Sequence, residues 1–179
     1  CLTHSIIDGL TQYFIFKSII LRNLYGVDIM VEATEIAKLR LFLKMVAVVE
    51  VDKRADNLGL DPLPDIDFNI RCGNTLVGYA TEEELETDLT YGDMFANLEF
   101  KEAVENEMKC VSESYESFRR IQLNQSEDMT AYKQAKGDLK LRLSSLNELL
   151  NRRLYGTTQI EYSDWLESHH PVHWLAEFY

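Results

Sequence analysis

The chain has 179 residues, of which 46% are hydrophobic, and its 30 acidic and 18 basic side chains give a formal net charge of −12. This length fits about one domain, the hydrophobic fraction excludes wholesale disorder, and the absence of any run of about 18 apolar residues excludes a predicted membrane span. The acidic balance argues against a protein that grips nucleic acid across its whole surface, although it leaves a local DNA contact open.

The first part of the chain predicts a helix, a strand and a second helix. Residues 10–21 have a broad apolar surface that indicates a helix, and residues 24–29 form a short run with Val and Ile that favours a buried strand. A longer helix is predicted from about residue 32 to about residue 51. Its apolar residues at helical spacing on one face, and two that widen this surface, are Ile36, Leu39, Leu43, Val46 and Ala47, and Leu41 and Phe42.

A loop and a second strand follow. Residues 52–66 hold all the helix breakers of this region, which predicts a loop, and residues 68–72 alternate apolar and polar, which predicts a strand ended by Gly73 and Asn74. Strand, helix and strand at this spacing predict a parallel βαβ unit with a right-handed connection.

The remainder of the chain is predicted to be helical. Residues 98–154 indicate two long helices with a break around residues 124–128, which together predict an antiparallel helical hairpin. The acidity is concentrated just before and within this part, because residues 81–116 carry twelve acidic side chains and only Lys101 and Lys109 as basic ones. The Glu-rich run at 82–86 is typical of a solvated helix face.

Two positions are candidate ligand-binding residues. Asp28 ends the first predicted strand, where ligands bind in open parallel sheets, and a carboxylate there can accept hydrogen bonds from both hydroxyls of a ribose. The apolar Ile29 and Met30 beside it could cover an adenine face. Asn74 follows the second strand and suits the edge of an adenine ring. Two plainer alternatives stay open: Asp28 could cap the following helix, and Gly73-Asn74 could be an ordinary turn.

Other chemistry is not indicated. The sequence contains neither a Gly-x-Gly-x-x-Gly nor a Gly-x-x-x-x-Gly-Lys-Ser/Thr run. His169, His170 and His173 lack an acidic or cysteine partner at matching spacing, and Pro171 would break a helix that aligned them, so no metal site is predicted. The cysteines Cys1, Cys72 and Cys110 are far apart and no signal peptide is present, so a reducing cytoplasmic location is expected.

Three sequence blocks resemble one family. The blocks are LYGVDI with EATEIAKLRL at 24–29 and 32–41, LPDIDFNIRCGNTLVG at 63–78, and HPVHWLAEFY at 170–179. Together, in this order, they are similar to the adenine-specific DNA methyltransferases fused to restriction enzymes, the type II, subtype G, restriction–modification proteins. The last block is similar to the one that leads into the catalytic Asn-Pro-Pro-Tyr loop of that family.

The resemblance implies a fold, a cofactor and a reaction. It implies an α/β, partial Rossmann-like methyltransferase fold, helix-rich because of its helical hairpin insertion, that binds S-adenosylmethionine and methylates the amino nitrogen of a flipped-out adenine in double-stranded DNA. By position, Asp28 would hold the cofactor ribose, Ile29 and Met30 would pack on its adenine, and Asn74 would meet the adenine edge. Many relatives have Asp at the position of Asn74, and Met30-Val31 stands where Asn-Pro is common.

Two family parts are missing from the 179 residues. These are the glycine-rich loop that cradles the methionine portion and the Asn-Pro-Pro-Tyr loop itself. Because the first residue is also Cys1 rather than Met, the expectation is a piece of a longer enzyme that is inactive alone and holds no catalytic residue. Its expected parts are a cofactor-binding α/β part (1–80), a helical insertion (81–168) and a lead-in to the catalytic loop (169–179).

Two other functions stay open on the sequence. One is a non-catalytic α/β scaffold whose helical hairpin contacts a partner. The other is part of a nucleotide-binding oxidoreductase, because ribose-binding acidic residues also serve dinucleotides, although the missing glycine fingerprint speaks against it. The oligomeric state also stays open on the sequence, because the hairpin and the open sheet edges could both self-associate.

Overall fold

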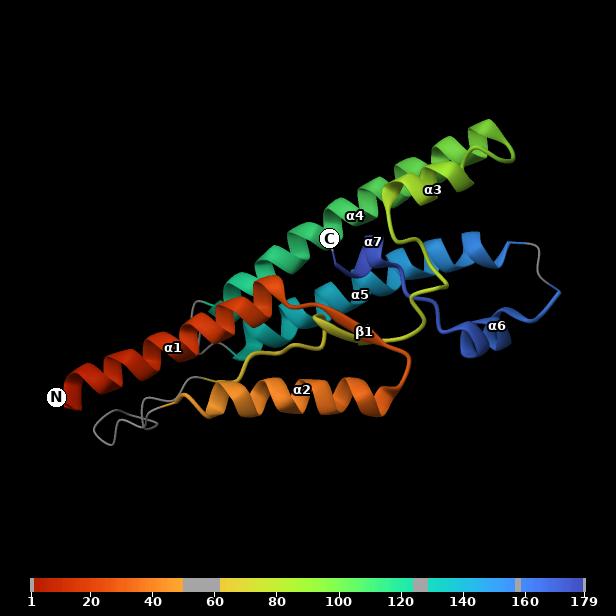
Figure 1. Cartoon of the computed structure of the whole chain (residues 1–179). Coiled ribbons are helices and arrows are strands. Elements are labelled where there is room, and N and C mark those ends of the chain that lie inside the picture. The colour runs from red at the N-terminus through yellow and green to blue at the C-terminus, as the bar shows by residue number, and fades with distance from the viewer. Residues whose placement is uncertain (1, 50–61, 124–128, 157–158, 179) are drawn as a thin grey trace.

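The computed structural model describes residues 2–49, 62–123, 129–156 and 159–178. Within them the chain forms seven helices and two strands (Figure 1). In chain order these are α1 (Leu2–Asn23), β1 (Gly26–Asp28), α2 (Val31–Val46), β2 (Ile70–Cys72), α3 (Glu82–Asp88), α4 (Met94–Leu123), α5 (Met129–Tyr155), α6 (Tyr162–His169) and α7 (Trp174–Glu177). No helix in this described part is long and apolar enough to cross a membrane.

The two strands pair in parallel, as the sequence predicts. Gly26 lies opposite Ile70 and Asp28 lies opposite Cys72, so both strands end at the same edge of the sheet. Both are shorter than predicted. In the second predicted strand, Asn69 has a buried side chain whose amide donates to the carbonyls of Ile20 and Leu24, each at 3.1 Å. Asn69 thereby satisfies carbonyls at the end of α1 and just after it.

Helix α2 packs through a different face from the one its periodicity singles out. Ile36, Leu39, Leu43 and Val46 are between 51% and 59% exposed. The fully buried residues are instead Thr34 and Met45, and Leu41 and Phe42 are partly buried in a cluster with α1. The cause is that α2 is apolar on more than one side, so spacing alone does not choose the packed face. The helix also ends earlier than predicted, at Val46; residues 50–61 lie outside the described part.

Helices α4 and α5 form the predicted antiparallel hairpin, and they are the longest elements in Figure 1. The predicted break at 124–128 lies outside the described residues. The hairpin core is an apolar cluster on the facing sides of both helices, which also takes in residues from outside the hairpin. Its main members are Val104, Met108, Val111, Phe118, Leu139, Leu143, Leu146 and Leu150, joined by Phe68, Tyr79, Leu85 and Leu175. The run at 82–86 falls in α3, where its glutamates are exposed, as predicted.

Candidate functional site at the strand ends

Asp28 closes β1 with its side chain exposed to solvent. Its Oδ1 accepts a hydrogen bond from the backbone N–H of Met30 at 2.8 Å, and its Oδ2 has no partner among the described residues. The N-cap of α2 is Met30, and no side chain caps that helix. Asp28 therefore orders the turn after the strand but does not cap the helix, so the capping alternative is wrong and part of the carboxylate is available to a ligand.

Two apolar side chains flank this carboxylate. Ile29 is 61% exposed and Met30 is 58% exposed. The turn that carries them lies against the end of β2, because the thiol of Cys72 is 3.5 Å from the carbonyl oxygen of Ile29. Exposed apolar side chains beside a carboxylate can cover the flat face of a ligand whose polar groups reach the oxygen atoms.

Asn74 lies beside Asp28, as the parallel pairing predicts. The N–H of Gly73 donates to the carbonyl of Asp28 at 2.9 Å, which holds the two strand exits together. The side-chain Oδ1 of Asn74 accepts from the N–H of Leu76 at 3.0 Å, so this residue does stabilise a turn. Its amide Nδ2 has no partner within the described part of the chain. Asn74 is therefore a turn residue that keeps a donor for a ligand.

A third segment, from almost one hundred residues further along, joins the same edge. Asn74 forms a parallel bridge with Pro171, and its N–H donates to the carbonyl of His170 at 2.7 Å. The N–H of Val172 donates to the carbonyl of Val77 at 2.9 Å. The three sequence blocks singled out above therefore meet at one edge of the two-stranded sheet.

Glycine makes this close approach possible. At Gly73 and Gly78, with φ of +155° and +147°, a Cβ atom would collide with atoms of Val172, and at Gly78 the clash is with its backbone carbonyl. Both positions also have a backbone conformation that other residues rarely adopt. The conformation of 73–79 is thus tied to the seating of residues 170–173.

His173 anchors this third segment from inside. It is fully buried and stacks on Tyr79, with ring centroids 5.6 Å apart. Its Nδ1 accepts from the N–H of Tyr79 at 3.1 Å, so the proton must sit on Nε2, which is 3.0 Å from Oδ1 of Asn151. Burial lowers the pKa of His173 to about 4, so the ring is neutral at pH 7. In the described residues no group of His, Cys, Asp and Glu could hold a metal ion.

A buried carboxylate secures the end of the segment. Glu177 is 5% exposed and forms an ion pair with Arg71 of β2, with a hydrogen bond of 2.9 Å, and accepts another from Asn147 of α5 at 2.7 Å. These partners are 106 and 30 residues away in the sequence, so no local pattern could have indicated them. Arg71, Asn151 and Glu177 hold the segment 170–178 against the strands, and they are not themselves candidate ligand-binding residues.

Comparison with known proteins finds a relative for part of the chain. No protein-family model matches it, and no solved structure matches it. A stretch of 75 residues, 41% of the chain, is 48% identical to part of a protein of Methanocaldococcus jannaschii named as a candidate type II restriction enzyme and methyltransferase. The match covers 6% of that protein, so the chain spans only a small part of its length. The chain is thus similar to a segment of a restriction–modification protein.

Proposed function

We propose that this chain is the central part of an adenine-specific DNA methyltransferase in a restriction–modification system, and that its strand ends bind the adenosine portion of S-adenosylmethionine. Two sequence observations support it: the similarity to a protein named as a candidate restriction enzyme and methyltransferase, and the order of the three sequence blocks. In this proposal the parallel pair β1–β2 is part of a Rossmann-like sheet, and the complete protein acts on double-stranded DNA.

The observation that carries the proposal is the placement of Asp28 and Asn74. They follow two neighbouring parallel strands and lie at the same sheet edge, with the strand exits joined by the Gly73–Asp28 hydrogen bond. The carboxyl ends of parallel strands are where open α/β sheets bind nucleotides. A carboxylate, a carboxamide and two exposed apolar side chains at that edge fit a nucleoside.

Each residue has a distinct role in this proposal. The carboxylate of Asp28 accepts hydrogen bonds from the ribose hydroxyls, and Ile29 with Met30 packs against the adenine face. Nδ2 of Asn74 donates to a ring nitrogen at the adenine edge, a bond that the Asp common in relatives could not donate when ionised. S-adenosylmethionine, when bound, supplies an activated methyl group. The residues of this chain orient its adenosine portion and contribute no proton transfer.

The segment 170–178 gives the site its connection to catalysis. In the proposed family its sequence leads into the Asn-Pro-Pro-Tyr loop, which holds the flipped-out adenine. Here it is fixed to the loop after β2 by backbone hydrogen bonds and by His173 and Glu177. The chain would thus hold the cofactor and the base of the catalytic loop in one rigid unit.

The gene itself provides a rapid test. The codons flanking this segment should encode a glycine-rich loop before residue 1 and an Asn-Pro-Pro-Tyr loop after residue 179. If neither is encoded there, the methyltransferase proposal fails, whatever the fold of the chain.

Binding of S-adenosylmethionine tests the site. In the full-length protein, Asp28→Ala should weaken binding measured by titration calorimetry by about 1–3 kcal/mol, the cost of leaving buried hydroxyls without an acceptor. Asp138→Ala removes an equal charge from an exposed position on α5 and should leave the affinity unchanged. Equal affinity of the wild type and the Asp28 variant would remove Asp28 from the site.

A further inference from the structure

The acidic part of the chain, which the proposed methyltransferase function does not use, forms a hollowed surface. A hollow of about 350 Å³ lies between α3 and α4, and a second of about 520 Å³ lies beside the first turns of α4. Leu89 and Lys101 line both hollows, so the two are neighbours. The area that contains both hollows is called the α3–α4 surface below.

The α3–α4 surface carries unusually exposed apolar side chains at one end. Met94 and Phe95 are each 74% exposed and Leu98 is 56% exposed, and all three line the second hollow. Tyr91, in the loop just before them, is also 74% exposed. A group of large exposed apolar side chains next to a hollow is typical of an interaction site. By contrast, the floor of the first hollow is made of buried residues such as Val104 and Met108.

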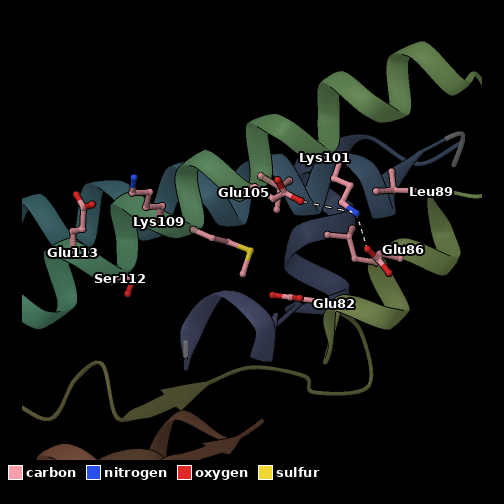
Figure 2. A pocket seen from close by; sticks show the side chains of 11 residues that line it. Glu82, Glu86, Leu89, Lys101, Glu105, Lys109, Ser112 and Glu113 are labelled. Atoms are coloured by element: carbon pink, nitrogen blue, oxygen red, sulfur yellow. Dashed lines mark hydrogen bonds and ion pairs between the residues drawn. The ribbon is translucent and has the colours of Figure 1, made fainter.

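Carboxylates surround the other end. Glu82, Glu86, Glu105 and Glu113 line the first hollow together with only two lysines (Figure 2). Lys101 does not offset the rest of the rim, because its ammonium is engaged by Glu86 at 2.6 Å and lies 3.9 Å from Glu105. Within the described residues, Glu82 and Glu113 have no ion-pair partner. Four carboxylates against Lys101 and Lys109 still leave the rim with a net charge of −2, so it attracts cations and repels phosphates.

We propose that the α3–α4 surface docks a basic amphipathic helix of a protein partner. The apolar side chains of that helix would pack on Met94, Phe95 and Leu98, and its lysines or arginines would lie along Glu82, Glu105 and Glu113. An amphipathic helix in a groove uses both features at once, with apolar anchors for affinity and charge for orientation. The same charges that favour such a helix exclude DNA from this face.

A labelled peptide tests this assignment. The probe is a 14-residue amphipathic helix of leucine and lysine carrying fluorescein, and its counterpart has glutamate in place of every lysine. Fluorescence anisotropy with the full chain at about 150 mM salt, where distant charges are screened, should show saturable binding of the lysine peptide and none of the glutamate peptide. No saturable binding of the lysine peptide would overturn the proposal.

Matched variants distinguish binding at the α3–α4 surface from nonspecific attraction to an acidic protein. The triple variant Glu82→Gln/Glu105→Gln/Glu113→Gln should bind the lysine peptide about tenfold more weakly, because three local charge contacts are lost. The control Glu83→Gln/Glu102→Gln/Glu116→Gln removes the same charge from exposed positions of α3 and α4 that do not line the hollows, and should bind within about twofold of the wild type. Equal weakening by both triples would show that only net charge matters and would overturn the proposal.

The apolar end is tested in the same way. Phe95→Ser/Leu98→Ser changes only exposed side chains, so the fold should be kept, and it should weaken peptide binding about fivefold or more. Leu141→Ser, which changes a 72% exposed residue of α5, is the control. Unchanged binding of the double variant would overturn the proposal. So would sedimentation showing a dimer of the chain that this variant dissociates, because the occupant would then be a second copy.

Discussion

His173 shows how a residue type associated with chemistry can be wholly structural. Its position among three closely spaced histidines invites a metal site, yet its ring is enclosed and both nitrogens are used, one by the backbone of Tyr79 and one by Asn151. A protonated ring would have to lose the bond to the N–H of Tyr79. The neutral ring is therefore part of the join between residues 170–178 and the loop after β2.

The lowered pKa of His173 makes stability depend on pH. Burial lowers the pKa from its ordinary value of 6.5 to about 4, so the contribution of the neutral ring is fully present above pH 6.5 and is lost as the pH falls toward 4. Between pH 7 and pH 5 this group alone should lower the unfolding free energy by about 2 kcal/mol. Urea unfolding at both values should show a fall smaller by that amount in His173→Gln. An equal fall in wild type and variant would contradict the assigned burial.

At the scale of elements, replacing two glycines by alanine should change stability in opposite directions. Gly78 has a positive φ and sits against the carbonyl of Val172, whereas Gly137 lies in α5 with nothing within 4 Å of where its Cβ would be. Gly78→Ala should cost about 2 kcal/mol or more, because the segment 170–173 must move away. Gly137→Ala should add about 0.5–1 kcal/mol, because alanine favours helix. Thermal unfolding of both variants gives the comparison, and a Gly78 variant as stable as wild type would contradict the described seating.

The sequence predicts these elements well where a pattern is local. The long helices 94–123 and 129–155 and the parallel pairing of the strands follow from periodicity and from the spacing of strand, helix and strand. The packed face of α2 does not, because Leu41 and Phe42 compete with Ile36 and Leu39 for the same role. Contact with α1 determines which side chains of α2 are buried, and the spacing of residues within α2 does not predict that contact.

The sequence likewise predicts only part of the candidate site. Asp28 and Asn74 could be placed together in advance, because parallel strands end at a common edge. The contribution of residues 170–178 could not, because its partners are long-range and its polar residues are used for anchoring. No pattern in the sequence marks Glu177 as buried, and the approach of Arg71 and Asn147 makes its burial possible.

For the molecule as a whole, some charged residues form ion pairs between elements, and others form an acidic surface. Asp65 and Asp67 connect the strand region to the hairpin: Lys136 of α5 forms ion pairs with both, and Lys38 of α2 pairs with Asp67 at 3.0 Å. Burial would raise the pKa of Asp67, but the hydrogen bonds and charges of Lys136 and Lys38 hold it below its ordinary value. The acidic excess lies elsewhere, on α3 and α4, so a net charge of −12 does not argue against DNA contact at the strand ends.

Identifying the base that receives the methyl group would show whether the complete protein is an adenine-specific DNA methyltransferase. The full-length protein is incubated with S-adenosylmethionine and unmethylated genomic DNA, which is long enough to contain any short recognition sequence, and the DNA is digested to nucleosides for mass spectrometry. We expect N6-methyladenine, and we expect Asp28→Ala to raise the KM for S-adenosylmethionine about tenfold or more, because a binding contact is lost. Methylated cytosine, no methylated base, or a KM unchanged by Asp28→Ala would contradict it.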